Sequence, residues 1–178
     1  MSFFHSTIGF SLALQLVGVA VLLLASVCDI CSRRIPNQFV LIVLGVGLVN
    51  LSLTPSPFLH LGGFLVVFAG TVVCWQMRWL GGGDTKLLTA AALLVPPTMI
   101  PLQLLAVMLV GGMLAVVAVF GRMGLVEPIR PAGHRAWTPL RVARIELWRI
   151  QHGEGLPYAV AIALGTVGAL IVSRGGVS

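Results

Sequence analysis

Charged side chains are scarce in this 178-residue sequence. Only 9% of its residues are charged, with 11 Lys and Arg against 5 Asp and Glu, whereas 58% are hydrophobic. A typical soluble domain has about 25% charged residues, and it covers itself with polar side chains. The mean hydropathy of +1.04 therefore excludes a water-soluble globule and indicates an integral membrane protein.

Cysteine is too rare for a closed disulfide framework, since the chain holds only Cys28, Cys31 and Cys74. The Cys28-x-x-Cys31 spacing resembles half of a zinc site, but a structural zinc site needs four ligands, usually from two such pairs. The spacings of His134 and His152 match no zinc finger. We therefore interpret the cysteines as small residues at a helix end on the reducing side, and we predict neither a metal nor a cofactor.

Apolar segments separated by polar or proline-rich gaps predict an all-α, polytopic membrane protein. We expect one domain over residues 1–178, a compact bundle of about six transmembrane helices. The first segment lacks the basic start and clear cleavage site of a signal peptide, so it is predicted to be a retained helix of about 20 residues. The predicted spans are 8–27, 38–53, 58–77, 87–95, 102–120 and 157–172.

The basic residues predict how the chain is oriented. Ten of the eleven Lys and Arg residues lie in the gaps after the first, third and fifth predicted spans, and only Arg174 lies on the other side. The positive-inside rule makes the basic side cytoplasmic and places both termini outside. This distribution accounts for the net charge of +6. We therefore expect the lipid bilayer, and not a nucleic acid, as the partner of these charges.

Aspartate occurs only twice, as Asp29 and Asp84, and both residues fall at the predicted cytoplasmic boundary. A carboxylate inside a membrane is unfavourable by about 2.5–3.5 kcal/mol at the bilayer centre unless it is paired or hydrated. Two carboxyl groups in one site cannot both ionise easily, so one stays protonated while the other is charged. Such a pair can activate a water and polarise a peptide carbonyl, which is peptide hydrolysis without a metal.

A glycine run, Gly81-Gly82-Gly83, directly precedes Asp84. Without Cβ atoms the backbone can turn sharply there and approach a substrate strand closely. Alternatively, the run is only a flexible turn and Asp84 caps the following helix, a role worth about 0.5–2 kcal/mol. The two roles can coexist. A phosphate-binding loop does not fit, because it needs four residues between its glycines and then Gly-Lys-Ser/Thr.

Three motifs resemble, in this order, those of the prepilin peptidases, which are intramembrane aspartyl proteases with a Gly-x-Gly-Asp signature. They are Asp29-x-x-x-Arg33-Arg34-Ile35-Pro36-Asn37, Gly81-x-Gly83-Asp84-x-Lys86-Leu87 and Pro157-Tyr158-Ala159-Val160-Ala161-Ile162-Ala163. The Ile-Pro-Asn form and the short chain are most similar to the small prepilin peptidases of tight-adherence (Flp-type) pilus systems.

The resemblance implies that Asp29 and Asp84 are the catalytic pair. It also implies that the partner is a pilin precursor, cut between its basic leader and its hydrophobic helix at the cytoplasmic face of the bacterial inner membrane. The larger prepilin peptidases carry an N-terminal cytoplasmic domain with two Cys-x-x-Cys pairs and also methylate the new pilin N-terminus. Here the first predicted span lies directly before Asp29, so we expect peptidase activity without methylation.

Residues around the aspartates are candidates for shaping the site. The basic ones are headgroup anchors or charged partners of the aspartates, and the Pro-Asn pair shapes the start of the second span. The Pro-Tyr pair lines the mouth of the site or belongs to an ordinary aromatic belt. These candidates are Arg33, Arg34, Pro36, Asn37, Gly81, Gly82, Gly83, Lys86, Pro157 and Tyr158.

One sizeable cytoplasmic segment is predicted at about 122–155. Within it, residues 140–150 place apolar and basic side chains at helical spacing, which is typical of a basic amphipathic helix on an anionic membrane surface. We expect this helix to gate the approach of a pilin helix or to meet the pilus assembly machinery.

A non-enzymatic membrane protein is the alternative: a small transporter or an assembly scaffold with the aspartates as proton or ion sites. A transporter typically holds its acids near the midplane and shows an internal repeat. The acids here fall at a boundary and no repeat is evident, so the three ordered motifs favour the peptidase.

Overall fold

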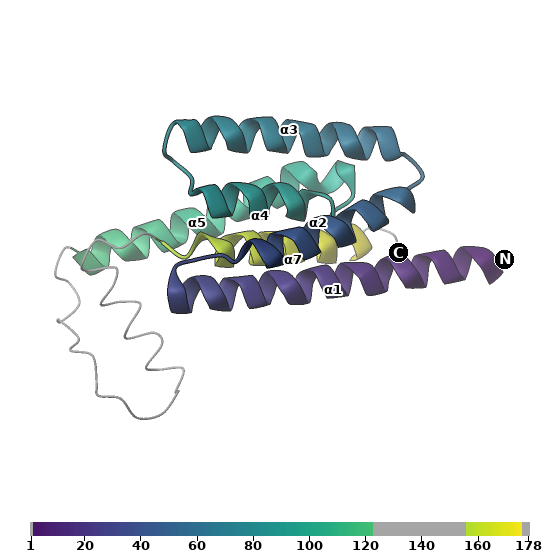
Figure 1. Cartoon of the computed structure of the whole chain (residues 1–178), viewed down its shortest axis with the longest axis horizontal. Helices are drawn as coiled ribbons and strands as arrows, with labels where there is room; N and C mark the ends of the chain where they lie inside the picture. The colour runs from purple at the N-terminus through teal and green to yellow at the C-terminus, as the bar shows by residue number, and fades with distance from the viewer. Residues whose placement is uncertain (1, 123–155, 176–178) are drawn as a thin grey trace, which may run out of the picture.

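The computed structural model describes residues 2–122 and 156–175 (Figure 1). Within these ranges the chain forms six α-helices and one short 3₁₀-helix, and no strand. The predicted all-α class is therefore confirmed. The elements are α1 (Ser2–Ser32), α2 (Asn37–Ser52), α3 (Pro57–Gln76), α4 (Gly82–Ala92), η1 (Pro97–Met99), α5 (Ile100–Arg122) and α7 (Tyr158–Gly175).

Four segments are long and apolar enough to cross a membrane: residues Gly9–Ser32, Pro57–Gln76, Pro97–Phe120 and Tyr158–Gly175. Their outward faces carry large apolar side chains, such as Val66 at 72% exposure and Met108 at 67%. A contiguous apolar surface of this kind marks contact with a membrane or another protein. Together with the hydropathy, it makes this chain a multi-pass membrane protein.

Helix α4 differs from the others because it is short and enclosed. Its eleven residues are about 16 Å long, roughly half of a hydrocarbon core of about 30 Å. Helix α4 alone is therefore too short to cross the membrane, and the predicted fourth span, 87–95, is not a complete transmembrane helix. The chain reaches the start of α5 at the other end of the bundle through the turn after α4 and η1 (Figure 1).

Residues 87–95 are all buried, and α4 packs against α2, α3 and α7. Glycines on the neighbouring helices make room for the end of this segment. A methyl group on Gly18 of α1 would lie 2.6 Å from Leu94 Cδ1, and one on Gly47 of α2 would lie 2.5 Å from Leu93 Cβ. Close approach over small residues is the usual way in which membrane helices pack. The short helix is therefore enclosed by α2, α3 and α7.

Two predicted boundaries are wrong in the same way. Residues 28–32, predicted as part of a polar gap, form the last turns of α1, so Asp29 is a helical residue and not a loop residue. Likewise α4 begins at Gly82, five residues before the predicted span. Hydropathy marks where an apolar run ends, but a helix continues beyond it when its polar side chains face the interior of the bundle.

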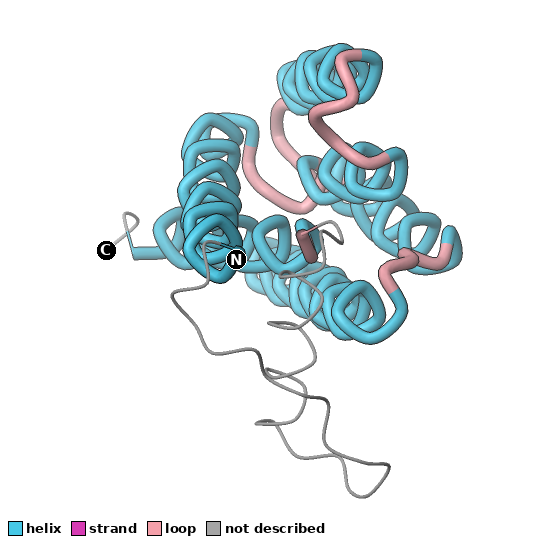
Figure 2. The backbone as a smooth tube through the Cα atoms, turned by 90° about the vertical axis from the view of Figure 1, so that its left-hand side faces the viewer, coloured by secondary structure: helices cyan, strands magenta, loops and turns pink. Residues whose placement is uncertain are grey.

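The polar junctions gather at one end of the molecule. In Figure 1 the end of α1, the start of α2, the junction of α3 and α4, and the start of α7 lie at the left. The first residues of α1 and the last described residues of α7 lie at the right. Figure 2 looks onto the left-hand end, where the loop from α1 to α2 and the loop from α3 to α4 face the viewer. The bundle therefore brings together the sequence motifs that surround Asp29 and Asp84.

Candidate active site

Asp29 lies in the last turns of α1 and is buried, with 7% of its surface exposed. The backbone N–H of Ala159 donates a hydrogen bond of 3.3 Å to its Oδ2 atom. Ala159 belongs to the first turn of α7, where N–H groups lack helical partners and carry partial positive charge. Ser26 of α1 fixes this junction by donating to the Ala159 carbonyl at 3.0 Å. The positive end of α7 therefore faces the Asp29 carboxyl group.

Asp84 is half-buried in the first turn of α4. Gly81 is the N-cap residue of this helix, so the alternative that Asp84 is itself the N-cap residue is wrong. A methyl group on Gly81 would lie 2.8 Å from Asp84 Oδ2 and would collide with the carboxyl group. The glycine at position 81 therefore provides the space that the Asp84 side chain occupies.

The two carboxyl groups influence each other. Burial and the nearby Asp29 carboxylate raise the pKa of Asp84 to about 7, while a hydrogen bond from the Gly81 backbone acts in the opposite direction. A carboxyl group that titrates near neutral pH can hold a proton and donate it, as an ordinary aspartate cannot. The structure thus places the two aspartates in one electrostatic environment.

The third motif contributes to the same place. Pro157 is buried and Tyr158 is half-buried, and the Tyr158 ring lies close enough to Asp84 to interact with its charge. The ring packs on Gly111 of α5, where a methyl group would lie 2.8 Å from Cε2. Tyr158 is therefore packed beside the aspartates, which favours a role in lining the site over an exposed aromatic belt.

The sharp backbone turns of the site lie at arginines and not at the predicted glycines. Arg33 and Arg78 have φ angles of 53° and 60°, in the left-handed region; Arg33 directly follows α1, and Arg78 follows the C-cap residue of α3. Gly81 has φ −69° and ψ 149°, while Gly82 and Gly83 belong to α4. A non-glycine residue in a sparsely populated region is strained by about 1–3 kcal/mol, and such residues cluster at functional sites. Arg78 was not among the predicted site residues, because nothing in an Arg-Trp pair signals a left-handed turn.

The remaining predicted residues divide by exposure. Arg33 is half-buried and its charge acts on Asp29, whereas Arg34 and Lys86 are exposed. Pro36 is the N-cap of α2 and Asn37 is its first residue, so this pair begins the second helix as predicted. Arg33 therefore fits the role of a charged partner, and Arg34 fits that of an anchor in the headgroups.

The three cysteines give no sign of a metal site. Cys28 and Cys74 are half-buried and Cys31 is exposed. Across residues 2–122 and 156–175, no three His, Cys, Asp or Glu side chains are placed to hold a metal ion. His134, His152 and the predicted amphipathic helix at 140–150 lie outside the described residues.

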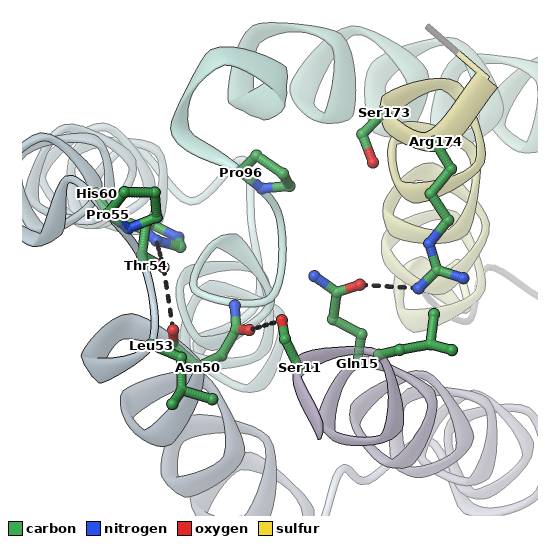
Figure 3. A pocket seen from close by; sticks show the side chains of 11 residues that line it. Ser11, Gln15, Asn50, Leu53, Thr54, Pro55, His60, Pro96, Ser173 and Arg174 are labelled. Carbon is green, nitrogen blue, oxygen red and sulfur yellow. Dashed lines mark hydrogen bonds between the residues drawn. The ribbon is translucent and has the colours of Figure 1, made fainter. Parts of the chain in front are cut away.

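A polar cluster that the sequence analysis missed lies where α4 ends, opposite the aspartates (Figure 3). Asn50 of α2 donates from Nδ2 to the Leu93 carbonyl at 3.2 Å and accepts from Ser11 Oγ at 2.8 Å. His60 of α3 is fully buried, with Thr54 Oγ1 3.3 Å from its Nδ1 atom and the Ala92 and Val95 carbonyls close by. The Asn50 amide thus pairs with a carbonyl group that a buried helix end would otherwise leave without a partner. In the sequence, this cluster was signalled only by an asparagine and a histidine that lie inside or beside apolar segments.

The family model described as the type IV leader peptidase family matches residues 16–116. The chain belongs to the type IV leader peptidase family. The matched region covers more than half of the chain and contains both aspartates. The resemblance inferred from the three motifs is thereby confirmed at the level of the family. Comparisons with curated proteins and with solved structures give no match. Membership makes the chain a protease of the leader-peptidase type, with pilin precursors as its kind of partner.

Proposed function

We propose that this leader peptidase is an intramembrane aspartyl endopeptidase of the Flp-pilus type, with Asp29 and Asp84 as its catalytic pair. The observation that carries the proposal is the meeting of three distant motifs at one end of the bundle. Ala159 donates to Asp29, and Asp84 interacts with both Asp29 and Tyr158. Residues 29, 84 and 158–159 come from three helices, so their convergence is a property of the fold.

The environments of the two carboxyl groups suit opposite protonation states. Burial disfavours the ionised form of both carboxyl groups, but at Asp29 the Ala159 N–H and the Arg33 guanidinium oppose this effect. At Asp84 the nearby Asp29 carboxylate adds to the effect of burial, and the pKa is about 7. We assign Asp29 as the ionised base and Asp84 as the acid. The two macroscopic titrations belong to the pair, because the groups interact.

The reaction that follows is addition of water to the scissile carbonyl. Asp29 removes a proton from the water while the water oxygen bonds to the carbonyl carbon, and Asp84 gives its proton to the carbonyl oxygen. In the collapse of the tetrahedral intermediate, Asp84 recovers that proton and Asp29 passes its proton to the leaving nitrogen as the C–N bond breaks. The products are a leader with a free carboxyl group and a pilin with a free amino group.

The proposal places this end of the bundle at the cytoplasmic face of the inner membrane. Arg33, Arg34, Arg78 and Lys86 lie at the junctions on this side, whereas Arg174 lies near the other end of α7. This asymmetry supports the orientation through the positive-inside rule. The proposal covers peptide hydrolysis only, since the three shared motifs assign no residue to methylation of the product.

The test is co-expression with an Flp-type prepilin, with leader removal followed by gel shift. Asp29→Asn and Asp84→Asn are near-isosteric, and each is expected to lower the cleavage rate by at least about 100-fold, the usual scale of acid–base catalysis. Each variant must insert at the wild-type level. Wild-type processing by either variant would contradict the aspartyl mechanism and favour a scaffold or transporter role for the carboxyl groups.

A further inference from the structure

An apolar groove of about 450 Å³ lies between α2 and α3. Both helices pack on α4, which forms the floor of the groove, while they make few contacts with each other. In Figure 1, α3 runs along the top of the bundle, with α4 between it and α2. The lining side chains are Asn37, Val40, Leu41, Leu44, Phe64, Phe68, Thr85, Lys86, Thr89 and Ala90.

We propose that this groove seats the hydrophobic helix of the pilin precursor while its leader junction lies at the aspartates. The inference rests on the proposed function and deepens it, because it assigns the surface that recognises the substrate. The proposed occupant is a single apolar helix that enters from the plane of the membrane.

Continuity with the candidate site is the first argument. Thr85 and Lys86 follow Asp84 directly in α4, and both line the groove. Asn37, at the start of α2, lines it as well. A helix lying in the groove would therefore end beside the Asp84 carboxyl group. The cavity in Figure 3 lies at the opposite end of the bundle and offers no such continuity.

The chemistry of the groove suits an apolar side-chain surface. Leu41 is 64% exposed and Phe68 is 48% exposed, on opposite walls. The threonine hydroxyls of the floor are satisfied within the protein: Thr85 Oγ1 donates to the Gly81 carbonyl at 3.0 Å, and Thr89 Oγ1 donates to the Thr85 carbonyl at 2.8 Å. The floor therefore demands no polar group from its occupant, and it is compatible with an aliphatic helix.

The size of the groove fits a helix that is partly embedded. One turn of an α-helix with its side chains, about 5.4 Å long and 10–12 Å wide, fills roughly 500 Å³. A space of about 450 Å³ thus accommodates about half of the cross-section of a helix over two turns. The other half of the helix would remain in lipid. We expect the precursor helix to enter the groove sideways from the lipid, because a hydrophobic helix that leaves the bilayer exposes its apolar surface to water.

Crosslinking tests the occupant without requiring cleavage. A photoreactive amino acid is placed at Leu41 or Phe68 in the Asp84→Asn background, with the full-length Flp-type precursor in the same membrane. Leu109 on α5, 65% exposed and not a lining residue, is the matched control. Adducts with the precursor helix from Leu41 and Phe68, but not from Leu109, are expected. Adducts only with lipid, only with a second copy of this chain, or equally from Leu109 would overturn the inference.

Filling the groove supplies the second measurement. Leu41→Trp is expected to lower precursor cleavage by about tenfold, whereas Leu109→Trp, an equal change at an equally exposed leucine, leaves it near the wild-type rate. Equal cleavage by the two tryptophan variants would overturn the assignment of the groove. Absence of cleavage by the wild-type chain would instead count against the proposed peptidase, and the crosslinks would still report whether the precursor helix occupies the groove.

Discussion

At the scale of single residues, the proton on Asp84 decides the chemistry. Its pKa is raised to about 7 by burial and by the Asp29 carboxylate. The folded state therefore holds this proton more tightly than the unfolded chain, whose aspartate titrates near the ordinary value of about 3.9. The resulting contribution to stability is complete below about pH 4 and is lost as the pH rises through about 7. Ionised Asp84 is the less stable folded form.

Stability measured against pH checks this assignment. We expect the thermal midpoint of the wild-type protein in detergent micelles to fall between pH 5 and pH 8, and that of Asp84→Asn to fall less, because the amide has no proton to lose. Parallel curves for the two proteins would mean that Asp84 has an ordinary pKa. The cleavage rate of the wild type is expected to decline above about pH 7 for the same reason.

Gly81 is the second single residue with a specific role, which is to leave space for the Asp84 side chain. Gly81→Ala would place a methyl group 2.8 Å from Asp84 Oδ2, so we expect the carboxyl group to shift and cleavage to fall by at least about tenfold. At Gly83 the added methyl group would lie 3.5 Å from Ile35, an ordinary contact, so Gly83→Ala is expected to cost much less. Rates for the two variants at matched expression test the explanation, and equal losses would contradict it.

At the scale of elements, α4 is the unusual component. It carries Asp84 at one end and stops inside the bundle at the other, where polar side chains meet its last carbonyl groups. A helix end buried without such partners would be costly. The cap formed by Asn50 therefore helps to hold the short helix, and with it Asp84, at a fixed depth.

Removing the Asn50 amide tests this cap. Asn50→Leu takes away the donor to the Leu93 carbonyl and the acceptor for Ser11, with an expected loss of about 1 kcal/mol of unfolding free energy. Ser11→Ala removes only the second contact and is expected to lose less. Unfolding by a denaturing detergent measures both, and an Asn50→Leu protein as stable as the wild type would contradict a capping role.

At the scale of the whole molecule, the sequence predicts the arrangement better than the details. The order of the three motifs and the alternation of basic gaps were enough to predict that Asp29 and Asp84 share one end of a helical bundle. Boundaries were less predictable, because Asp29 turns inward from α1 and the first turn of α4 contains two glycines. The left-handed arginines at 33 and 78 and the cap at Asn50 depend on tertiary contacts, which no local pattern specifies.

The central claim is that one pair of aspartates in this chain hydrolyses the leader junction of a pilin precursor. The most direct measurement uses the purified protein and a purified Flp-type precursor together in lipid vesicles, with the products identified by mass spectrometry. We predict cleavage at the junction of leader and hydrophobic helix by the wild type, and none by Asp29→Asn or Asp84→Asn at equal incorporation. Cleavage that persists in either variant, or a wild-type protein that leaves the precursor intact, would contradict this account.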